Sequence, residues 1–370
     1  MVTRVLAGAG LAVVAVVVAL ALVEGLASLA ISAGLFLGRS GHVELDRFTR
    51  YDAELGWVSR PHVVLPDLYG PGVGLHTTAK GFRGTREPSN PAAAGLRRVV
   101  CSGDSFTFGV GVGDADTWCA RLAEHDPRLE PINMGQGGYG VDQAFLWYRR
   151  DGAELAPAIH VFAFIDGDFG RMRDARFVGD YGKPTLALRD GALVVENVPA
   201  WRRPFWMPTI RVREIIRRTK TFELVGRIQR RVAPAPPPVV DADERTALVE
   251  VALAVFAELR ALAARHGTRL VLVYLPTGFD CALPVDAPPG LEWWRAIEPR
   301  ARAAGFEIVD PTADCRRLPR AEQAALFLPE GVVDFWGAAG HYTVAGHRFI
   351  ATRVAARVTD DAPAAASSRR

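Results

Sequence analysis

Hydrophobic and polar positions divide the chain into three kinds of pattern. Apolar, uncharged runs fill residues 5–23 and 25–38 and are separated only by Glu24. Residues 39–97 hold many Gly and Pro and show little periodicity, which is typical of irregular structure. From residue 98 onward, short β-rich runs alternate with stretches of helical periodicity. This alternation predicts a mostly parallel sheet that helices cover on both faces.

The alternating part contains five strands and five helices by this pattern. The clearest helix covers 243–266, where apolar residues share one face, acidic residues open the helix and Gly267 ends it. An insertion of about 70 residues, at 170–240, is longer than a crossover needs. Inside it, Asp190-Gly191 between alternating apolar residues predicts a hairpin over 185–197. The expected strands are 98–102, 131–134, 159–165, 269–275 and 306–309, and the expected helices are 116–125, 141–151, 243–266, 289–304 and 343–358.

The first apolar run is long enough to cross a membrane. Its 19 uncharged residues would span about 28 Å as a helix, close to the hydrocarbon thickness of a bilayer. The run is also longer than the apolar region of an ordinary cleaved signal. We therefore expect residues 1–38 to be a retained single-pass anchor, with a signal peptide as the alternative. Either one exports the rest of the chain.

Composition and charge narrow the picture further. A chain of 370 residues that is 49% hydrophobic can bury a substantial core, here expected over 98–360 after a stem at 39–97. The formal net charge of +3 requires no nucleic-acid partner. Residues 201–231 hold ten basic and two acidic residues, which fits a solvated helix face, a membrane-surface contact or a lid over an anionic substrate. A Pro-rich linker at 234–238 comes next, and residues 361–370 are expected to be a disordered tail.

The four cysteines show no C-x-x-C spacing, which excludes a zinc ribbon. Cys281 and Cys315 follow the fourth and fifth strands, and we hypothesise a disulfide between them in an oxidising compartment. Cys101 is expected to be a small buried hydrophobe in the first strand, and Cys119 to lie on a core-facing helix.

Chemistry-bearing residues follow the carboxyl ends of the strands, where open parallel sheets bind ligands. Ser105 follows the first strand, a glycine-rich loop follows the second, and His341 precedes the last helix. A hydroxyl, an imidazole and backbone N–H donors are the groups that nucleophilic acyl transfer requires. Asp166 and Asp168 follow the third strand, although an Asp there is commonly a turn former.

Each of these residues also has a simpler interpretation. Ser105 could cap the helix that comes after it. Gly135, Gly137 and Gly140 spell G-x-G-x-x-G, the dinucleotide fingerprint, which leaves a nucleotide-binding protein as an alternative. A metal site built on His341 and His347 lacks a third ligand at a recognisable spacing.

Three ordered blocks and a two-part lead-in resemble the SGNH (GDSL-type) hydrolases. Residues 99–109, with Gly103-Asp104-Ser105, resemble the first block, whose serine is the nucleophile. Residues 133–140 with Gln143 resemble the second block, whose glycine N–H, here that of Gly138, serves the oxyanion hole together with the N–H of Ser105. Residues 341–347 resemble the block with the catalytic histidine, here His341. Residues 51–57 and 81–84 resemble the lead-in of membrane-anchored bacterial members.

The resemblance implies a three-layer, flavodoxin-like α/β fold with a central, mostly parallel five-stranded sheet, plus an N-terminal transmembrane helix. It also implies a serine esterase or O-acyltransferase on the periplasmic side of a bacterial cell membrane, acting on acylated carbohydrate or lipid. We expect no cofactor, no metal and no nucleic-acid partner.

Two positions depart from the family pattern. Gly167 stands where the family has an oxyanion-hole asparagine, so Asn133 or another group would have to replace that donor. Ala338 stands where the family has an aspartate, which leaves Asp334 as the candidate orienter of His341. Because of these departures, a binding or assembly module that has lost efficient chemistry stays as the second hypothesis. Asp104, Asn133, Asp166 and Asp168 are further candidate site residues.

Overall fold

The computed structural model describes residues 2–37, 47–177, 181–201, 219, 221, 224–225, 228, 232, 241–335 and 337–359. The chain divides into two compact units, one of residues 1–40 with 204–240 and the other of residues 41–203 with 241–370. The expected tail, the Pro-rich linker and most of the basic segment lie outside the described residues.

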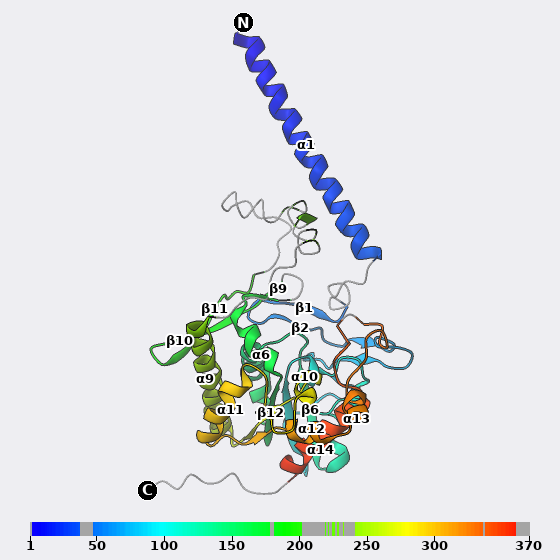
Figure 1. Cartoon of the computed structure of the whole chain (residues 1–370), viewed down its shortest axis with the longest axis vertical. Helices are drawn as coiled ribbons and strands as arrows, with labels where there is room; N and C mark the ends of the chain where they lie inside the picture. The colour runs from blue at the N-terminus through cyan, green and yellow to red at the C-terminus, as the bar shows by residue number, and fades with distance from the viewer. Residues whose placement is uncertain are drawn as a thin grey trace. The chain divides into compact units, whose positions relative to one another are not determined.

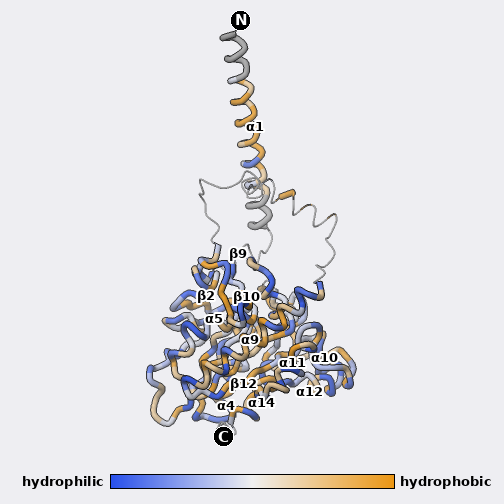
Figure 2. Tube along the Cα trace, turned by 90° about the vertical axis from the view of Figure 1, so that its left-hand side faces the viewer, coloured by the Kyte–Doolittle hydropathy of each residue, from blue (hydrophilic) through white to orange (hydrophobic). Residues whose placement is uncertain are grey.

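The first unit contains the long helix α1, Val2–Leu37. Its residues 10–30 are long and apolar enough to cross a membrane, with a mean hydropathy of 2.5 (Figure 2). Glu24, the charge inside this apolar stretch, accepts hydrogen bonds from the backbone N–H and the hydroxyl of Thr221 at 3.0 and 2.9 Å. A charge in such a helix is expensive without a partner, so Thr221 compensates for part of that cost.

The second unit is built on the five-stranded sheet that the sequence predicts. The strands lie in the order β13-β12-β7-β5-β6, and every pairing between them is parallel. The α/β fold class is therefore confirmed. The strands are β5 (Arg97–Gly103), β6 (Leu129–Gly135), β7 (Ile159–Phe164), β12 (Arg269–Tyr274) and β13 (Ile308–Val309).

Helices cover both faces of this sheet, which gives three layers (Figure 1). Alternate strand residues point to opposite faces: Val99 and Val161 pack into the core cluster beneath α4 and α14. On the other face, Phe162 and Phe164 contact Phe256 of α9, with ring centroids 6.2 and 5.5 Å apart. The covering helices are α4 (Leu122–His125), α5 (Val141–Trp147), α9 (Ala242–His266), α11 (Trp294–Ala303) and α14 (Val344–Val358).

Several helices differ from the expectation. The helix expected at 116–125 is reduced to a 3₁₀ turn, Asp114–Asp116, and the short α4. The helix α5 ends at Trp147 and continues as a π-helical turn, Tyr148–Gly152, then a 3₁₀ turn, Ala153–Leu155. Short helices that carry too few turns for a visible periodicity were not predicted: α3 (Ser105–Phe108), α6 (Asp166–Gly170), the 3₁₀ turn Arg171–Arg173, α10 (Gly278–Ala282), α12 (Thr312–Arg317) and α13 (Arg320–Ala325).

The region expected to be a stem belongs to the folded body from Phe48 onward. Phe48 and Leu75 are buried in one cluster with Phe108 and Val110, directly beyond Ser105 in the chain. The periodicity was too short to reveal its two hairpins, which pair β1 (Thr49–Asp52) with β2 (Gly56–Ser59) and β3 (Val64–Leu65) with β4 (Leu75–His76).

The insertion after β7 contains the predicted hairpin. Strands β10 (Thr185–Arg189) and β11 (Ala192–Glu196) pair antiparallel around Asp190 and Gly191, which have φ values of 51° and 77°. Such positive values at both central residues suit a tight hairpin turn. A smaller hairpin of β8 (Arg176–Phe177) and β9 (Tyr181–Gly182) precedes it.

The cysteines form two disulfides. The Cys281–Cys315 bond confirms the hypothesis drawn from the sequence. Cys101 and Cys119, expected to be thiols, are bonded to each other instead. Both lie fully buried in the same core cluster, which brings their Cα atoms to 6.2 Å, within bonding range.

Candidate active site

Ser105 is the first residue of helix α3, immediately beyond the carboxyl end of β5. The side chain of Asp104 accepts a hydrogen bond from the N–H of Phe106 at 2.9 Å and caps this helix. The capping role that Ser105 could have filled therefore belongs to Asp104. The hydroxyl of Ser105 lies 2.8 Å from Nε2 of His341 and 3.2 Å from Oδ2 of Asp104.

His341 and Ser105 come together although 236 residues separate them. The Nε2 atom of His341 lies 2.8 Å from the Oγ atom of Ser105, and its Nδ1 atom lies 3.2 Å from the carbonyl oxygen of Ala338. A carbonyl oxygen only accepts hydrogen bonds, so Nδ1 carries the proton of the neutral ring. Nε2 is then unprotonated and can accept the serine proton.

Burial lowers the pKa of His341, and the charge of Arg171 lowers it further. The charge of Asp104 and the hydrogen bond to the Ala338 carbonyl raise it, but the pKa stays below its ordinary value. The imidazole is therefore neutral at pH 7. A neutral imidazole is the form that acts as a general base.

The backbone carbonyl of Ala338 contacts Nδ1 of His341, where sequence analysis expected the carboxylate of Asp334. Asp334, the candidate orienter, is exposed to solvent, while Ala338 is buried. The buried ring of Phe335 anchors the intervening loop in the cluster around Phe48. The carbonyl of Ala338 faces Nδ1 of His341, so a backbone dipole lies next to this ring nitrogen.

The loop after β6 supplies the candidate oxyanion donor. Gly138 has a φ of +81°, a backbone conformation that favours glycine. Gly135 is a glycine for another reason, because a Cβ there would lie 2.1 Å from the backbone nitrogen of Phe108. Close packing of β6 on α3 accounts for that glycine. A Cβ on Gly140 would lie 2.6 Å from Oδ1 of Asp142 and 3.0 Å from the carbonyl oxygen of Asp168, so close packing accounts for two of the three glycines in the G-x-G-x-x-G spacing.

Asn133 does not replace the missing asparagine. Its amide nitrogen donates to the carbonyl of Thr107 at 2.8 Å, and its oxygen accepts from the N–H of Gly135 at 2.9 Å. The side chain thus ties β6 to α3. Gly167 is exposed, and a Cβ built on it would meet only Ile165, at 3.7 Å. The surroundings of position 167 therefore leave space for a side chain at its Cβ.

Asp104, Asp168 and Arg171 form a cluster beside Ser105. Arg171 donates to Asp168, to Asp104 at 3.3 Å and to the carbonyl of Tyr139 at 3.0 Å. Burial and the neighbouring Asp104 raise the pKa of Asp168 well above its usual range. Arg171 was not singled out from the sequence, and its spacing three residues after Asp168 was the available signal.

Asp166 serves the fold. Its two carboxylate oxygens accept from the backbone N–H groups of Glu292, Trp293 and Trp294, at 2.8 to 3.2 Å, at the start of α11. Burial raises the pKa of this carboxyl. Within the described residues, no three His, Cys, Asp or Glu side chains gather so that they could hold a metal ion.

Arg83 is a buried cation that sequence analysis included only as part of the segment 81–84. Its guanidinium donates to the carbonyls of Phe108, Gly109 and Val112 at 2.5 to 2.6 Å and pairs with Asp114 at 2.8 Å. These bonds satisfy the carboxyl end of α3, whose first residue is Ser105. Arg83 therefore stabilises the short helix that begins at Ser105.

These residues define a class of site: a serine and a neutral histidine at the carboxyl edge of a doubly covered parallel sheet, with a glycine-rich loop at the same edge. No protein-family model matches the chain. No curated protein matches it either.

Several solved structures are similar to the chain. A member of the lipolytic G-D-S-L family from Veillonella parvula is 12% identical, with a TM-score of 0.37, over 72% of this chain and 100% of its own. The lipase/acylhydrolase from Enterococcus faecalis is 11% identical, with a TM-score of 0.37, over 73% and 100%. A catalytic mutant of an acetylxylan esterase from Geobacillus stearothermophilus is 12% identical, with a TM-score of 0.35, over 70% and 92%.

Proposed function

We propose that the chain is a serine acyl-ester hydrolase of SGNH type, tethered by α1 and acting outside the cytoplasm. The observation that carries the proposal is the 2.8 Å contact between His341 Nε2 and Ser105 Oγ. A nucleophile within hydrogen-bond reach of a base that a third group orients is the signature of covalent catalysis. Here the third group is the carbonyl of Ala338.

In the first step, His341 removes the proton of Ser105 as Oγ attacks the ester carbonyl. The N–H groups of Ser105 and Gly138 stabilise the resulting oxyanion. The tetrahedral intermediate then expels the alcohol, which takes the proton from His341 and leaves an acyl group on Ser105. Attack by water, again with His341 as base, releases the acid and restores the serine.

The same acyl-enzyme could pass its acyl group to a sugar hydroxyl instead of water. The products would then be an O-acylated carbohydrate and a free serine, and the reaction would be an acyl transfer. We propose acylated carbohydrate or lipid as the substrate class, because the resemblance to membrane-anchored relatives and the apolar helix α1 both support a location at the cell envelope.

A serine-directed fluorophosphonate tests the proposal on the purified protein. We expect labelling of Ser105 in the natural chain and none in Ser105→Ala, with His341→Ala reducing the labelling rate by about 1000-fold or more. Thermal unfolding of each variant shows whether it is folded. A folded natural chain that is not labelled at Ser105 would refute the enzyme and favour the binding or assembly module.

A further inference from the structure

The first hairpin, β1–β2, packs against the loop that carries Gly138. The indole Nε1 of Trp57, in β2, donates to the carbonyl oxygen of Gly137 at 2.9 Å. The hydroxyl of Tyr139 donates back to the carbonyl of Trp57 at 2.5 Å. Ser59, also in β2, donates to the side chain of Gln136 at 2.7 Å. Residues on both sides of Gly138 are therefore bonded to this hairpin.

The contact on Gly137 bears directly on the candidate oxyanion donor. The Gly137 carbonyl and the Gly138 N–H belong to one planar trans peptide group and point in opposite directions. A donor fixed on the oxygen therefore fixes the direction of the N–H. A hydrogen bond accepted by the carbonyl also polarises the same peptide group and strengthens its N–H as a donor.

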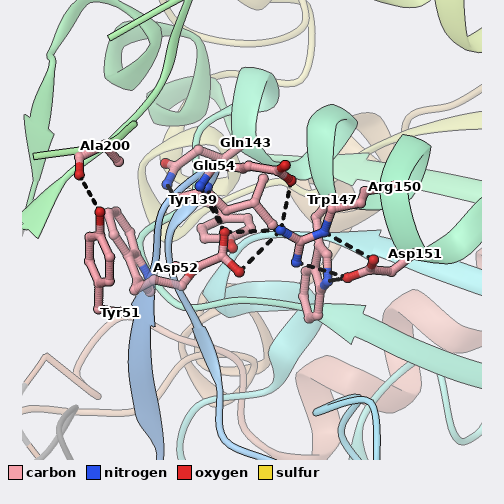
Figure 3. A network of polar contacts seen from close by, with 11 residues as sticks. Tyr51, Asp52, Glu54, Tyr139, Gln143, Trp147, Arg150, Asp151 and Ala200 are labelled. Carbon is pink, nitrogen blue, oxygen red and sulfur yellow. Dashed lines mark hydrogen bonds and ion pairs between the residues drawn. The ribbon is translucent and has the colours of Figure 1, made fainter. Parts of the chain in front are cut away.

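The hairpin is itself held firmly. Arg150 forms ion pairs with Asp52 of β1 at 2.9 Å, with Glu54 in the turn at 3.1 Å and with Asp151 at 3.0 Å (Figure 3). Gln143 of α5 donates to the carbonyl of Leu55 at 2.7 Å. These bonds restrict the motion of the hairpin relative to α5, which begins directly after the glycine-rich loop.

The indole is also fixed by its surroundings. Trp57 is 3% exposed, and its ring meets that of Tyr139 edge-on, with centroids 5.5 Å apart. Burial raises the pKa of Tyr139 well above its usual range, so its hydroxyl stays protonated and continues to donate to Trp57. The pair therefore keeps its hydrogen bonds over the working range of pH.

We propose that Trp57 is a positioning residue of the oxyanion hole, which sets and polarises the Gly138 N–H through the carbonyl of Gly137. The inference rests on the proposed function. It also gives the hairpin that precedes the sheet in the chain a direct role at the site. A hairpin serving only as structural packing would not need a donor on this particular carbonyl.

The matched variants are Trp57→Phe and Trp147→Phe. Each removes one indole N–H and keeps an aromatic ring against Tyr139, since Trp147 packs on the same tyrosine with centroids 5.8 Å apart. The difference is the acceptor, because the indole of Trp147 donates to Asp151.

We expect Trp57→Phe to lower kcat about 10-fold, a fraction of the loss on deleting an oxyanion donor. We expect KM and the midpoint of the pH profile to be unchanged, and Trp147→Phe to match the natural chain.

Hydrogen–deuterium exchange separates this inference from the proposed function. Exchange of the peptide spanning 136–140 should rise in Trp57→Phe and stay unchanged in Trp147→Phe, whether or not the protein turns over esters. Absence of Ser105 labelling in the natural chain would refute the proposed function, while the exchange result still decides whether Trp57 holds the loop. Equal turnover and equal exchange in the two variants would overturn the inference. Should Trp57→Phe not fold, benzothienylalanine at position 57 keeps the bicyclic ring and removes only the N–H.

Discussion

Ser105 contacts one nitrogen of the His341 ring, and the backbone carbonyl of Ala338 contacts the other. A Ser-His-Asp triad has a charged carboxylate in place of this carbonyl. The Ala338 carbonyl fixes the productive tautomer, which is one of the roles of the aspartate in a Ser-His-Asp triad. It supplies no full negative charge to stabilise the imidazolium. The site therefore resembles a dyad whose orientation is preserved.

Buried His341 should control the pH dependence of turnover. Its pKa lies below the ordinary value of 6.5 because burial disfavours the charged ring. Activity is then fully present at neutral pH and is lost as the pH falls through the lowered pKa. We expect kcat/KM for p-nitrophenyl acetate to have its acid midpoint below 6.5. A midpoint at or above that value would show that the ring is charged more easily than its burial allows.

Introducing an asparagine at position 167 should increase the rate of the proposed reaction. The Cβ of a new side chain there meets only Ile165, at 3.7 Å, so Gly167→Asn adds a donor without a steric conflict. Since removing one such donor costs about 100- to 1000-fold, we expect kcat to rise by about tenfold or more. Gly167→Ala is the control and should match the natural chain. A gain in both variants would point to the backbone instead of the amide.

The residues that could be predicted at the site are those with unusual chemistry in a recognisable order. Ser105, Gly138 and His341 were predicted in this way. The 2.8 Å contact places the serine and histidine together, while the oxyanion role of Gly138 stays a prediction. Ala338 could not be found, because a backbone carbonyl has no sequence signal. Trp57 was visible only as part of a lead-in motif, since its hydrogen bond spans 80 residues.

At the scale of elements, repeated periodicity explains which parts were predictable. Strands β5, β6, β7 and β12 and helix α9 were expected because their apolar positions recur over several residues. The hairpins β1–β2 and β3–β4 have two to four residues in each strand, too few to show alternation. Their formation depends on burial against α3 and the loop after β6, which is a tertiary effect.

The insertion is joined to the site through a buried ion pair. Lys183 contacts Asp142 at 2.6 Å, with both side chains fully buried, and also donates to the carbonyl of Arg171 at 2.9 Å. Removing one partner leaves a buried charge, which costs about 3–5 kcal/mol. We therefore expect Lys183→Met to lower the free energy of unfolding in urea by a similar amount.

The double variant Lys183→Met with Asp142→Leu provides the control for this ion pair. With both charges gone, most of the lost stability should return. Burial raises the pKa of Asp142 in spite of Lys183, so without the lysine this carboxyl would take up a proton more readily. If the double variant is as unstable as the single one, packing rather than charge pairing explains the loss.

For the whole molecule, the two disulfides make the free energy of unfolding depend on the redox conditions. The Cys101–Cys119 and Cys281–Cys315 bonds join residues that are 18 and 34 positions apart. By the loop-entropy relation, each should contribute about 3–4 kcal/mol to the free energy of unfolding. We expect Cys101→Ala with Cys119→Ala to lose about 3 kcal/mol in urea unfolding under oxidising conditions. Under reducing conditions the natural chain should lose at least as much, and equal stability in both buffers would contradict the bonding.

The apolar helix provides the last prediction. Helix α1 continues without a break from Val2 to Leu37, which is longer than the apolar region of about 7–15 residues in an ordinary cleaved signal. We expect the purified protein to keep its N-terminus by intact mass and to remain in the membrane fraction after carbonate extraction. A chain lacking residues 2–37 should move to the soluble fraction and still label at Ser105, because the site lies within the second unit. Loss of about 15–30 N-terminal residues from the natural chain, the length of a signal peptide, would instead identify the helix as a cleaved signal.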